Sequence, residues 1–199
     1  EGDDERTVQL VREALEQNAN PTEIVDSGLR ASMIIVGDKF SSGEFFIPEM
    51  LFAARAVTRS LDVLRPLLLD SDAITIGRVV IGTVAGDIHD IGKRLVGMFL
   101  EGAGFEVTDL GTSVSAERFV TAVKEHHSDI LGMSALLTTT MPGMAATIQA
   151  LESAGIRHQV KVIVGGAPVT QHFADRIGAD GYGADGGAAI KLCRKLVVK

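Results

Sequence analysis

One stretch of the sequence decides the fold: Val79-Val80-Ile81-Gly82-Thr83-Val84-Ala85-Gly86-Asp87-Ile88-His89-Asp90-Ile91-Gly92-Lys93. Its first six residues are mostly β-branched and apolar, which predicts a buried strand. Gly86 and Asp87 then end the strand pattern, and apolar residues recur at helical spacing over 91–102. A buried strand followed directly by a helix is typical of a parallel sheet covered by helices.

The same alternation continues to the end of the chain. Further strands are predicted over 105–110, 130–133 and 160–164, with a weak fifth near Gly181-Tyr182. Helices are predicted over 116–126, 144–153, 171–177 and 188–197. The pattern predicts an α/β domain over residues 74–199, built on a doubly wound five-stranded parallel sheet. We therefore expect functional residues in the loops that follow the strands.

The first seventy residues contain no strand pattern. Apolar residues recur at helical spacing over 8–15, 24–36 and 48–69, and Asn20 precedes a helix start at Pro21. Gly37 and the Ser41-Ser42-Gly43 cluster are expected to break the middle helix. Residues 1–70 are thus predicted to form a bundle of three or four helices. The polar segment Asp70-Ser71-Asp72 is expected to link the bundle to the α/β domain.

Composition narrows the function classes. The chain has 199 residues and a formal net charge of −7, which disfavours a general nucleic-acid binder. Its single cysteine, Cys193, excludes an internal disulfide and a Cys-rich zinc site. No apolar run approaches the roughly 18 residues of a membrane helix. Because the amino end, 1–6, is acidic where a secretory signal would be basic, we expect a cytoplasmic protein without a membrane partner.

Nucleotide-binding loops do not explain the segment after the first strand. Five residues separate Gly86 from Gly92, and Arg94 follows Lys93, so the phosphate-loop spacing fails twice. No G-x-G-x-x-G sequence follows a strand either. What remains is His89 two residues after Asp87 at the end of a strand, which fits either a ligand site or a helix-capping loop with a solvated histidine.

Four ordered motifs resemble those of cobalamin-binding proteins. Asp87-Ile88-His89-Asp90-Ile91-Gly92 resembles the D-x-H-x-x-G signature of cobalamin-binding domains, and Ser134-Ala135-Leu136 and Gly165-Gly166 follow in the family's order. Residues 43–49, Gly-Glu-Phe-Phe-Ile-Pro-Glu, look like the segment that caps the cofactor in methionine synthase and in corrinoid proteins of methyltransferase systems. The resemblance covers essentially the whole chain and implies a flavodoxin-like or Rossmann-like cobalamin-binding domain after a helical cap.

The resemblance also implies roles for individual residues. His89 is the expected lower axial ligand of cobalt, Asp87 the acceptor that orients its ring, and Thr140 the hydroxyl of the same relay. The remaining expected contacts surround the nucleotide tail or the corrin, and no separate catalytic group is expected. The complete expected cofactor site is Gly86, Asp87, Ile88, His89, Asp90, Gly92, Ser134, Leu136, Thr138, Thr140, Gly165, Gly166, Tyr182, Ala184 and Phe46.

The implied function is that of a methyl carrier that does not turn over alone. A cobalamin or related corrinoid, bound base-off and His-on, would cycle between methylcobalamin and cob(I)alamin. The expected partners are a substrate-specific methyltransferase, an acceptor methyltransferase that uses tetrahydrofolate or coenzyme M, and a reductive activase. The methyl donor stays open among methanol, methylamines, betaine, aryl methyl ethers and thiols. A cobalamin-sensing regulator, a mutase subunit and a cobalamin-free signalling domain are the alternatives.

Overall fold

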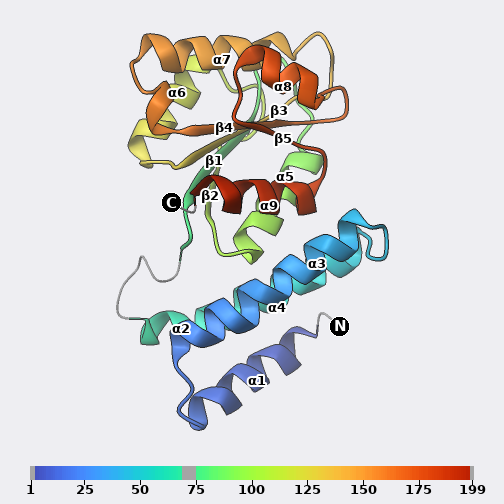
Figure 1. Ribbon diagram of the computed structural model, residues 1–199, viewed down its shortest axis with the longest axis vertical. Helices are drawn as coiled ribbons and strands as arrows, with labels where there is room; N and C mark the ends of the chain where they lie inside the picture. The colour runs from blue at the N-terminus through green and yellow to red at the C-terminus, as the bar shows by residue number, and fades with distance from the viewer. Residues whose placement is uncertain (1–2, 69–74, 198–199) are drawn as a thin grey trace.

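The computed structural model describes residues 3–68 and 75–197, and Figure 1 shows a helical amino-terminal part below an α/β part. The helical part consists of α1 (Asp4–Glu16), a continuous helical run made of α2 (Pro21–Glu23), the π-helical η1 (Ile24–Arg30) and α3 (Ala31–Ser41), then α4 (Ile47–Leu64) with the short η2 (Arg65–Leu67). Asn20 caps the run as predicted, because its side chain accepts a hydrogen bond from the Thr22 amide at 2.8 Å. The predicted polar link Asp70–Asp72 lies outside the described residues.

Gly37 does not break its helix, contrary to the prediction. It lies inside α3, which continues to Ser41. A Cβ built on Gly187 would lie 2.4 Å from the Gly37 carbonyl oxygen and 2.4 Å from Ser41 Oγ. The two glycines therefore permit a close crossing between α3 and the last helix, and this contact outweighs the low helix propensity of glycine.

The α/β part contains the predicted doubly wound parallel sheet. The strands are β1 (Arg78–Thr83), β2 (Glu106–Asp109), β3 (Ile130–Ser134), β4 (Lys161–Gly165) and β5 (Gly181–Gly183), in the order β2-β1-β3-β4-β5. All neighbouring pairs are parallel, and the weak fifth strand is present. The connecting helices are α5 (Ile91–Gly102), α6 (Ala116–Glu125), α7 (Pro142–Ser153), α8 (Gln171–Ile177) and α9 (Gly186–Val197), with the short η4 (Arg157–Gln159) before β4.

Helices cover both faces of the sheet. α6, α7 and α8 lie on one face, and α5 and α9 lie on the other, between the sheet and the helical part (Figure 1). Met50 of α4 is fully buried in the same cluster as Phe99 of α5, so the helical part shares a core with the sheet.

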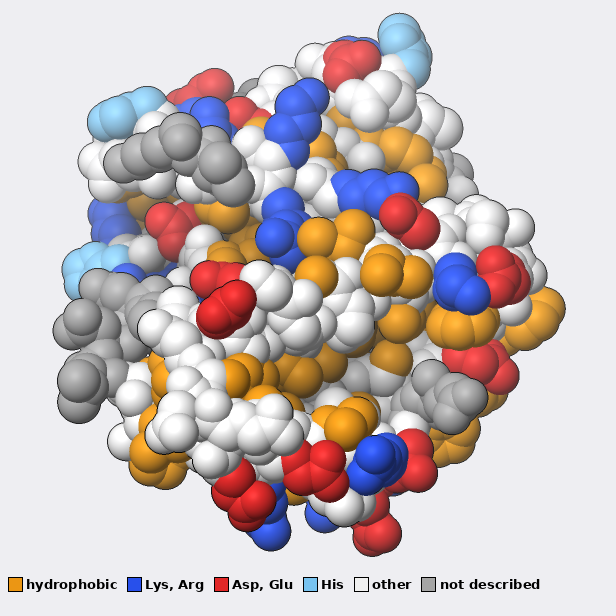
Figure 2. Space-filling model, turned by 60° about the horizontal axis from the view of Figure 1, so that its bottom comes forward, with side chains coloured by type: hydrophobic (Ala, Val, Ile, Leu, Met, Phe, Trp, Pro, Cys, Tyr) orange, Lys and Arg blue, Asp and Glu red, His pale blue; other side chains and the backbone are white. Residues whose placement is uncertain are grey.

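The face of the helical part carries mixed charges. Figure 2, which brings this face forward, shows acidic and basic side chains interspersed with apolar ones. Asp4 of α1 pairs with Arg55 at 2.9 Å and with Arg59 at 2.7 Å on α4. In the described part of the chain, no helix has the length and apolar character needed to span a bilayer.

Candidate cofactor site

The strand register brings four loops to one edge of the sheet. Thr83 is the register partner of Ser134, Ser134 of Gly165, and Gly165 of Gly183. Because these residues are the last ones of β1, β3, β4 and β5, the loops that follow all begin side by side. The loop after β1 contains the D-x-H-x-x-G motif, and the loop after β3 leads to Thr140. Residues about fifty positions apart thus meet at the carboxyl edge of the sheet.

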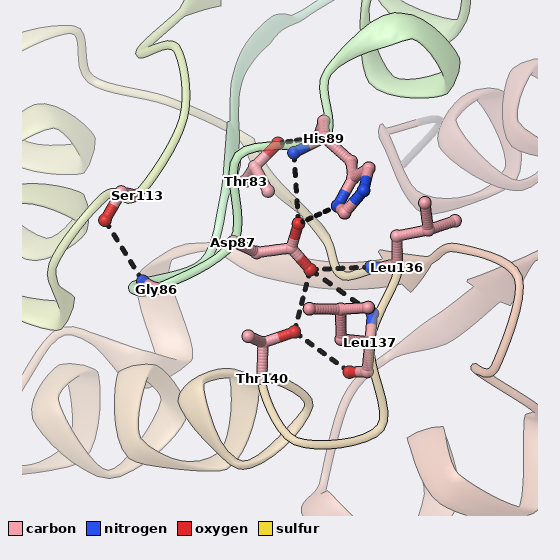
Figure 3. A network of polar contacts seen from close by, with 8 residues as sticks. All are labelled: Thr83, Gly86, Asp87, His89, Ser113, Leu136, Leu137 and Thr140. Carbon is pink, nitrogen blue, oxygen red and sulfur yellow. Dashed lines mark hydrogen bonds and ion pairs between the residues drawn. The ribbon is translucent and has the colours of Figure 1, made fainter.

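Asp87 is the centre of the network at this edge (Figure 3). Its side chain is fully buried and accepts five hydrogen bonds. Oδ1 accepts from the His89 amide at 3.1 Å and faces His89 Nδ1 at 2.7 Å. Oδ2 accepts from the amides of Leu136 at 2.8 Å and Leu137 at 3.3 Å, and from Thr140 Oγ1 at 2.7 Å. Both carboxylate oxygens are therefore saturated by donors.

This environment keeps Asp87 ionised. Burial by itself raises the pKa of the carboxyl group, but the hydrogen bonds from Thr140, from the amides of His89 and Leu136, and from the His89 ring outweigh it. The pKa of Asp87 is consequently held well below its ordinary value. Burying a carboxylate costs free energy because its hydrogen bonds to water are lost. Here the protein donors replace those bonds, so the negative charge is stable inside the protein.

The His89 ring is fixed in one tautomer by this carboxylate. An ionised carboxylate only accepts hydrogen bonds, so the proton of the neutral ring lies on Nδ1. Nε2 then carries a lone pair, and no hydrogen bond to it is made within the described residues. The side chain is 46% exposed while its partner Asp87 is fully buried. One nitrogen is anchored and the other is available as a ligand.

A second set of contacts holds the backbone of the motif loop. Ser113, in the loop after β2, accepts a hydrogen bond from the Gly86 amide at 3.0 Å and donates its own amide to the Asp87 carbonyl at 2.9 Å. Thr83 Oγ1 donates to the carbonyl of His89 at 2.9 Å. These contacts, and those of the Leu136 and Leu137 amides, were not predicted from the sequence. A main-chain donor has no residue signature, and Ser113 lies outside the recognised motifs.

Large exposed apolar side chains lie in the two loops that meet at Asp87. Ile88 and Ile91 are 76% and 77% exposed, and Leu136 and Leu137 are exposed as well. Ile88 and Ile91 lie within the motif, one on each side of His89 in the sequence, whereas the two leucines follow β3 and touch Asp87 through their amides. Exposed apolar side chains gathered at one site indicate a surface that an apolar partner or ligand covers.

The structure explains the glycines at positions 92, 165 and 166 of the site in different ways. Gly166 has a φ of +122°, and a Cβ there would lie 2.0 Å from the Ala135 carbonyl oxygen, so the chain itself requires glycine. A Cβ on Gly165 would lie 3.0 Å from the Gly183 carbonyl oxygen. A Cβ on Gly92 meets nothing within 4 Å. Gly92 therefore borders open space, and Gly166 shapes a close contact between the loops after β3 and β4.

The other expected site residues are spread along the same edge. Ser134 is half-buried at the end of β3, Thr138 is exposed in the following loop, and Ala184 is exposed just after β5. Tyr182 is half-buried and packs on the core under α6, α7 and α8. Asp90 forms an ion pair with Arg94 at 2.7 Å and is the N-cap residue of α5.

Phe46 lies in the helical part, at the end of the α3–α4 connection. It is the N-cap residue of α4, and its side chain is 66% exposed. Ser41, at the end of α3, donates a hydrogen bond to Asp185 Oδ1 at 3.1 Å, which joins the α3–α4 connection to the loop after β5. Lys39 contacts the neighbouring Phe45 ring at 4.9 Å. The helical segment that contains Phe46 thus begins beside one of the loops of the site.

The donor set fits a metal that brings most of its own ligands. Within the described residues, no group of three or more His, Cys, Asp or Glu side chains could hold a bare metal ion. His89 offers a single oriented nitrogen in an apolar rim. A cobalt corrinoid would fit this arrangement, because its macrocycle would supply most of the metal's ligands and the protein would need to supply only one imidazole.

Comparison with known proteins agrees with this fit. A family model described as a B12 binding domain matches residues 77–191, and a second model of that description matches residues 1–65. The trimethylamine corrinoid protein 2 of Methanosarcina acetivorans is 46% identical over 99% of this chain and 92% of that protein. The dimethylamine corrinoid protein of Methanosarcina barkeri is 42% identical over 96% of this chain and 90% of that protein.

Solved structures show the same architecture. A cobalamin-binding protein from Desulfitobacterium hafniense aligns with a TM-score of 0.84 at 33% identity, covering 98% of this chain and 93% of that chain. The methanol:cobalamin methyltransferase complex of Methanosarcina barkeri aligns with a TM-score of 0.83 at 29% identity, covering 98% of this chain and 75% of that chain. The chain therefore belongs to the family of B12-binding corrinoid proteins that includes the methylamine corrinoid proteins, and its cofactor is a cobalamin or a related corrinoid.

Proposed function

We propose that this protein carries a methyl group between two methyltransferases and binds its corrinoid base-off, with His89 as the lower axial ligand of cobalt. The observation that carries the proposal is the buried Asp87 carboxylate, which fixes the His89 ring and leaves Nε2 as the available donor. When bound, the corrinoid would supply the cobalt chemistry on which methyl transfer depends.

Each residue of the network has a distinct task in this proposal. Asp87 keeps the proton of the His89 ring on Nδ1, so that Nε2 presents its lone pair. Thr140 and the amides of Leu136 and Leu137 keep the carboxylate ionised and immobile. The exposed apolar side chains of the motif and of the loop after β3 would pack against the corrinoid and exclude water from His89 Nε2.

The proposal extends to the nucleotide tail and the upper face. The residues that would hold the displaced tail lie along the strand edge: Gly92, Ser134, Thr138, the Gly165-Gly166 pair, Tyr182 and Ala184. Residues 74–199 form the cofactor-binding domain, and residues 1–70 form a cap with Phe46 over the upper face. The hydrogen bond between Ser41 and Asp185 supports this placement, because it holds the α3–α4 connection beside the loop after β5.

The relatives support the identity of the partners. Two of them are named as trimethylamine and dimethylamine corrinoid proteins, and we therefore propose a methylamine as the methyl donor. A solved relative is part of a methanol:cobalamin methyltransferase complex, which supports a methyltransferase as the docking partner. We further propose an acceptor methyltransferase that uses coenzyme M or tetrahydrofolate, a reductive activase, and a cytoplasmic location. A regulator or a mutase subunit is not favoured, because the matches to corrinoid proteins span nearly the whole chain.

The test is anaerobic reconstitution with hydroxocobalamin followed by reduction to the Co(II) state. We expect stoichiometric binding and a paramagnetic resonance spectrum with nitrogen coupling from the axial imidazole, which His89→Ala abolishes. His172→Ala is the matched control, because His172 is an exposed histidine on α8. Coupling that survives in His89→Ala would remove His89 as the ligand. Methyl transfer from trimethylamine in the presence of a cognate methyltransferase then tests the donor.

A further inference from the structure

Lys93 is a buried cation that the network around Asp87 does not use. Its side chain is 3% exposed, and it is the third residue of α5, four positions after His89. The amino end of a helix carries a partial positive charge, so a buried lysine there is doubly unfavourable. Its ion-pair partner is Asp109, which bonds the ammonium group through both carboxylate oxygens. Such a pair adds little net stability compared with apolar residues, which favours a role in holding the surrounding segments in place.

Asp109 joins α5 to the loop after β2. It is the last residue of β2, and its Oδ1 also accepts a hydrogen bond from the Gly111 amide at 2.9 Å. The carbonyl of Gly111 in turn accepts from the Thr83 amide at 3.0 Å, at the end of β1. The carboxylate therefore connects the helix after the motif to the strand before it.

The loop after β2 then runs along the motif loop. Val84 and Val114 form a parallel bridge, and the Val114 amide donates to the Thr83 carbonyl at 2.9 Å. Ser113, the residue before Val114, accepts a hydrogen bond from the Gly86 amide and donates its own amide to the Asp87 carbonyl. Ser113 has a φ of +51°, a conformation that costs free energy for a residue other than glycine. The strained residue is thus the one whose hydroxyl and amide both hold the motif.

Together, these contacts hold the backbone on both sides of His89. One arm runs from α5 through Lys93 and Asp109, and the other returns through Ser113 to Gly86 and Asp87. The Asp87 carboxylate sets the tautomer and rotation of the imidazole, whereas the contacts of Lys93, Asp109 and Ser113 fix the backbone from which the imidazole projects. A metal–nitrogen bond requires its ligand to be held within about 0.5 Å, so the backbone position matters as much as the tautomer.

We propose that the Lys93–Asp109 pair and Ser113 are positioning residues that fix the His89 backbone, and with it the reach of the imidazole toward a bound cobalt. They thereby set the ratio of protein with histidine coordinated to protein with histidine dissociated. This inference rests on the proposed ligation by His89. Outer contacts of metal-binding histidines typically change metal affinity about 10- to 100-fold, and we expect changes of the lower size here.

The experiment uses the full chain reconstituted with hydroxocobalamin. We compare wild type, Lys93→Met, Asp109→Asn, Ser113→Ala and Ser113→Gly. Asp180→Asn is the matched control: it removes the Arg157–Asp180 ion pair, which lies at the amino edge of the sheet and has a similarly shielded carboxylate. Bound cobalamin, the melting temperature and the coordinated fraction in the Co(II) spectrum are measured for each. In the cofactor-free protein, amide hydrogen exchange of Gly86 reports directly on the loop.

We expect Lys93→Met, Asp109→Asn and Ser113→Ala to lower the ratio of coordinated to dissociated histidine about 10-fold while cobalamin still binds stoichiometrically. Ser113→Gly should lower it similarly, because relieving the strain does not restore the hydroxyl. Gly86 exchange should accelerate in Ser113→Ala, and the Asp180→Asn control should keep the wild-type ratio. Wild-type ratios in all three variants would overturn the inference and leave His89 ligation intact. A wild-type spectrum without nitrogen coupling would instead refute the proposed function and the inference with it.

Discussion

Replacing Asp87 by asparagine is the sharpest perturbation of the site, because it changes hydrogen-bonding capacity with almost no change in shape. Two donors from His89 face Oδ1, and three donors face Oδ2. An asparagine has one acceptor oxygen, so its amide group must face one of these two sets of donors. Because three donors face the Oδ2 position, we expect the asparagine oxygen to lie there, and the asparagine amide group then faces His89.

This substitution reverses the tautomer of His89. Nδ1 can accept from the asparagine amide only if the ring proton moves to Nε2, and Nε2 is then no longer a ligand. The His89 amide also loses its acceptor. Hydrogen bonds to charged groups contribute about 1.5–3 kcal/mol each, so the loss of this one should lower the free energy of unfolding by about 1.5–3 kcal/mol. For a chain of this size, that lowers the melting temperature by roughly 3–12 °C.

Two assays separate the effects on tautomer and stability. Nitrogen NMR of isotope-labelled histidine in the cofactor-free protein should show Nδ1 protonated in wild type and Nε2 protonated in Asp87→Asn. The Co(II) spectrum of the reconstituted variant should lose its nitrogen coupling. Thermal unfolding at neutral pH measures the expected decrease in melting temperature. An Asp87→Asn protein that keeps the wild-type tautomer and melting temperature would refute the reasoning, because the carboxylate would then not govern the ring.

Three further outcomes follow from the same structure. Thr140→Val removes one hydroxyl from the buried carboxylate and should cost about 1.5–3 kcal/mol in urea unfolding at neutral pH; no loss there would mean that water replaces the hydroxyl. Burial raises the pKa of the Cys193 thiol to about 12, so a thiol reagent at pH 8 should label it only in denaturant. In the unfolded state the thiol has an ordinary pKa of about 8.5. The folded state should therefore lose stability relative to the unfolded state as the pH rises from about 8.5 toward 12. Rapid labelling of the native protein would contradict this burial. Gly166→Ala should prevent stable folding because of its φ of +122° and the 2.0 Å contact of its Cβ, whereas Gly28→Ala, whose Cβ meets nothing within 4 Å inside η1, should gain about 0.5–1 kcal/mol. Equal melting temperatures for the two alanine variants would contradict the close approach of the loops at Gly166.

The periodicity of the chain was sufficient to predict the layers. Helix α5 and helix α8 have the predicted bounds, and the short strand β5 was found from two residues. The prediction failed at Gly37, where local propensity indicated a break and the crossing with Gly187 keeps the helix continuous. Propensity describes one segment at a time, whereas the helix crossing depends on a residue about 150 positions away.

The motif predicted the chemistry of the site but only part of its construction. Asp87 and His89 are two residues apart, so their pairing is local and readable from the sequence. Thr140 was assigned only through the resemblance, and the structure places its hydroxyl against Asp87. Ser113 and the amides of Leu136 and Leu137 were not predicted. Main-chain donors are present at nearly every position, so no residue type reveals which ones a carboxylate will use.

By itself, the sequence determined the order of strands and helices, the carboxyl edge as the functional edge, and the His–Asp pair, because these depend on spacing along the chain. Only the tertiary structure decided how that pair is supported. The register that aligns Thr83, Ser134, Gly165 and Gly183 brings the loop after β3 to Asp87, and the loop after β2 brings Ser113 to the motif. Contacts between distant segments form only when several elements pack together, so a buried, fully bonded carboxylate is a property of the folded chain.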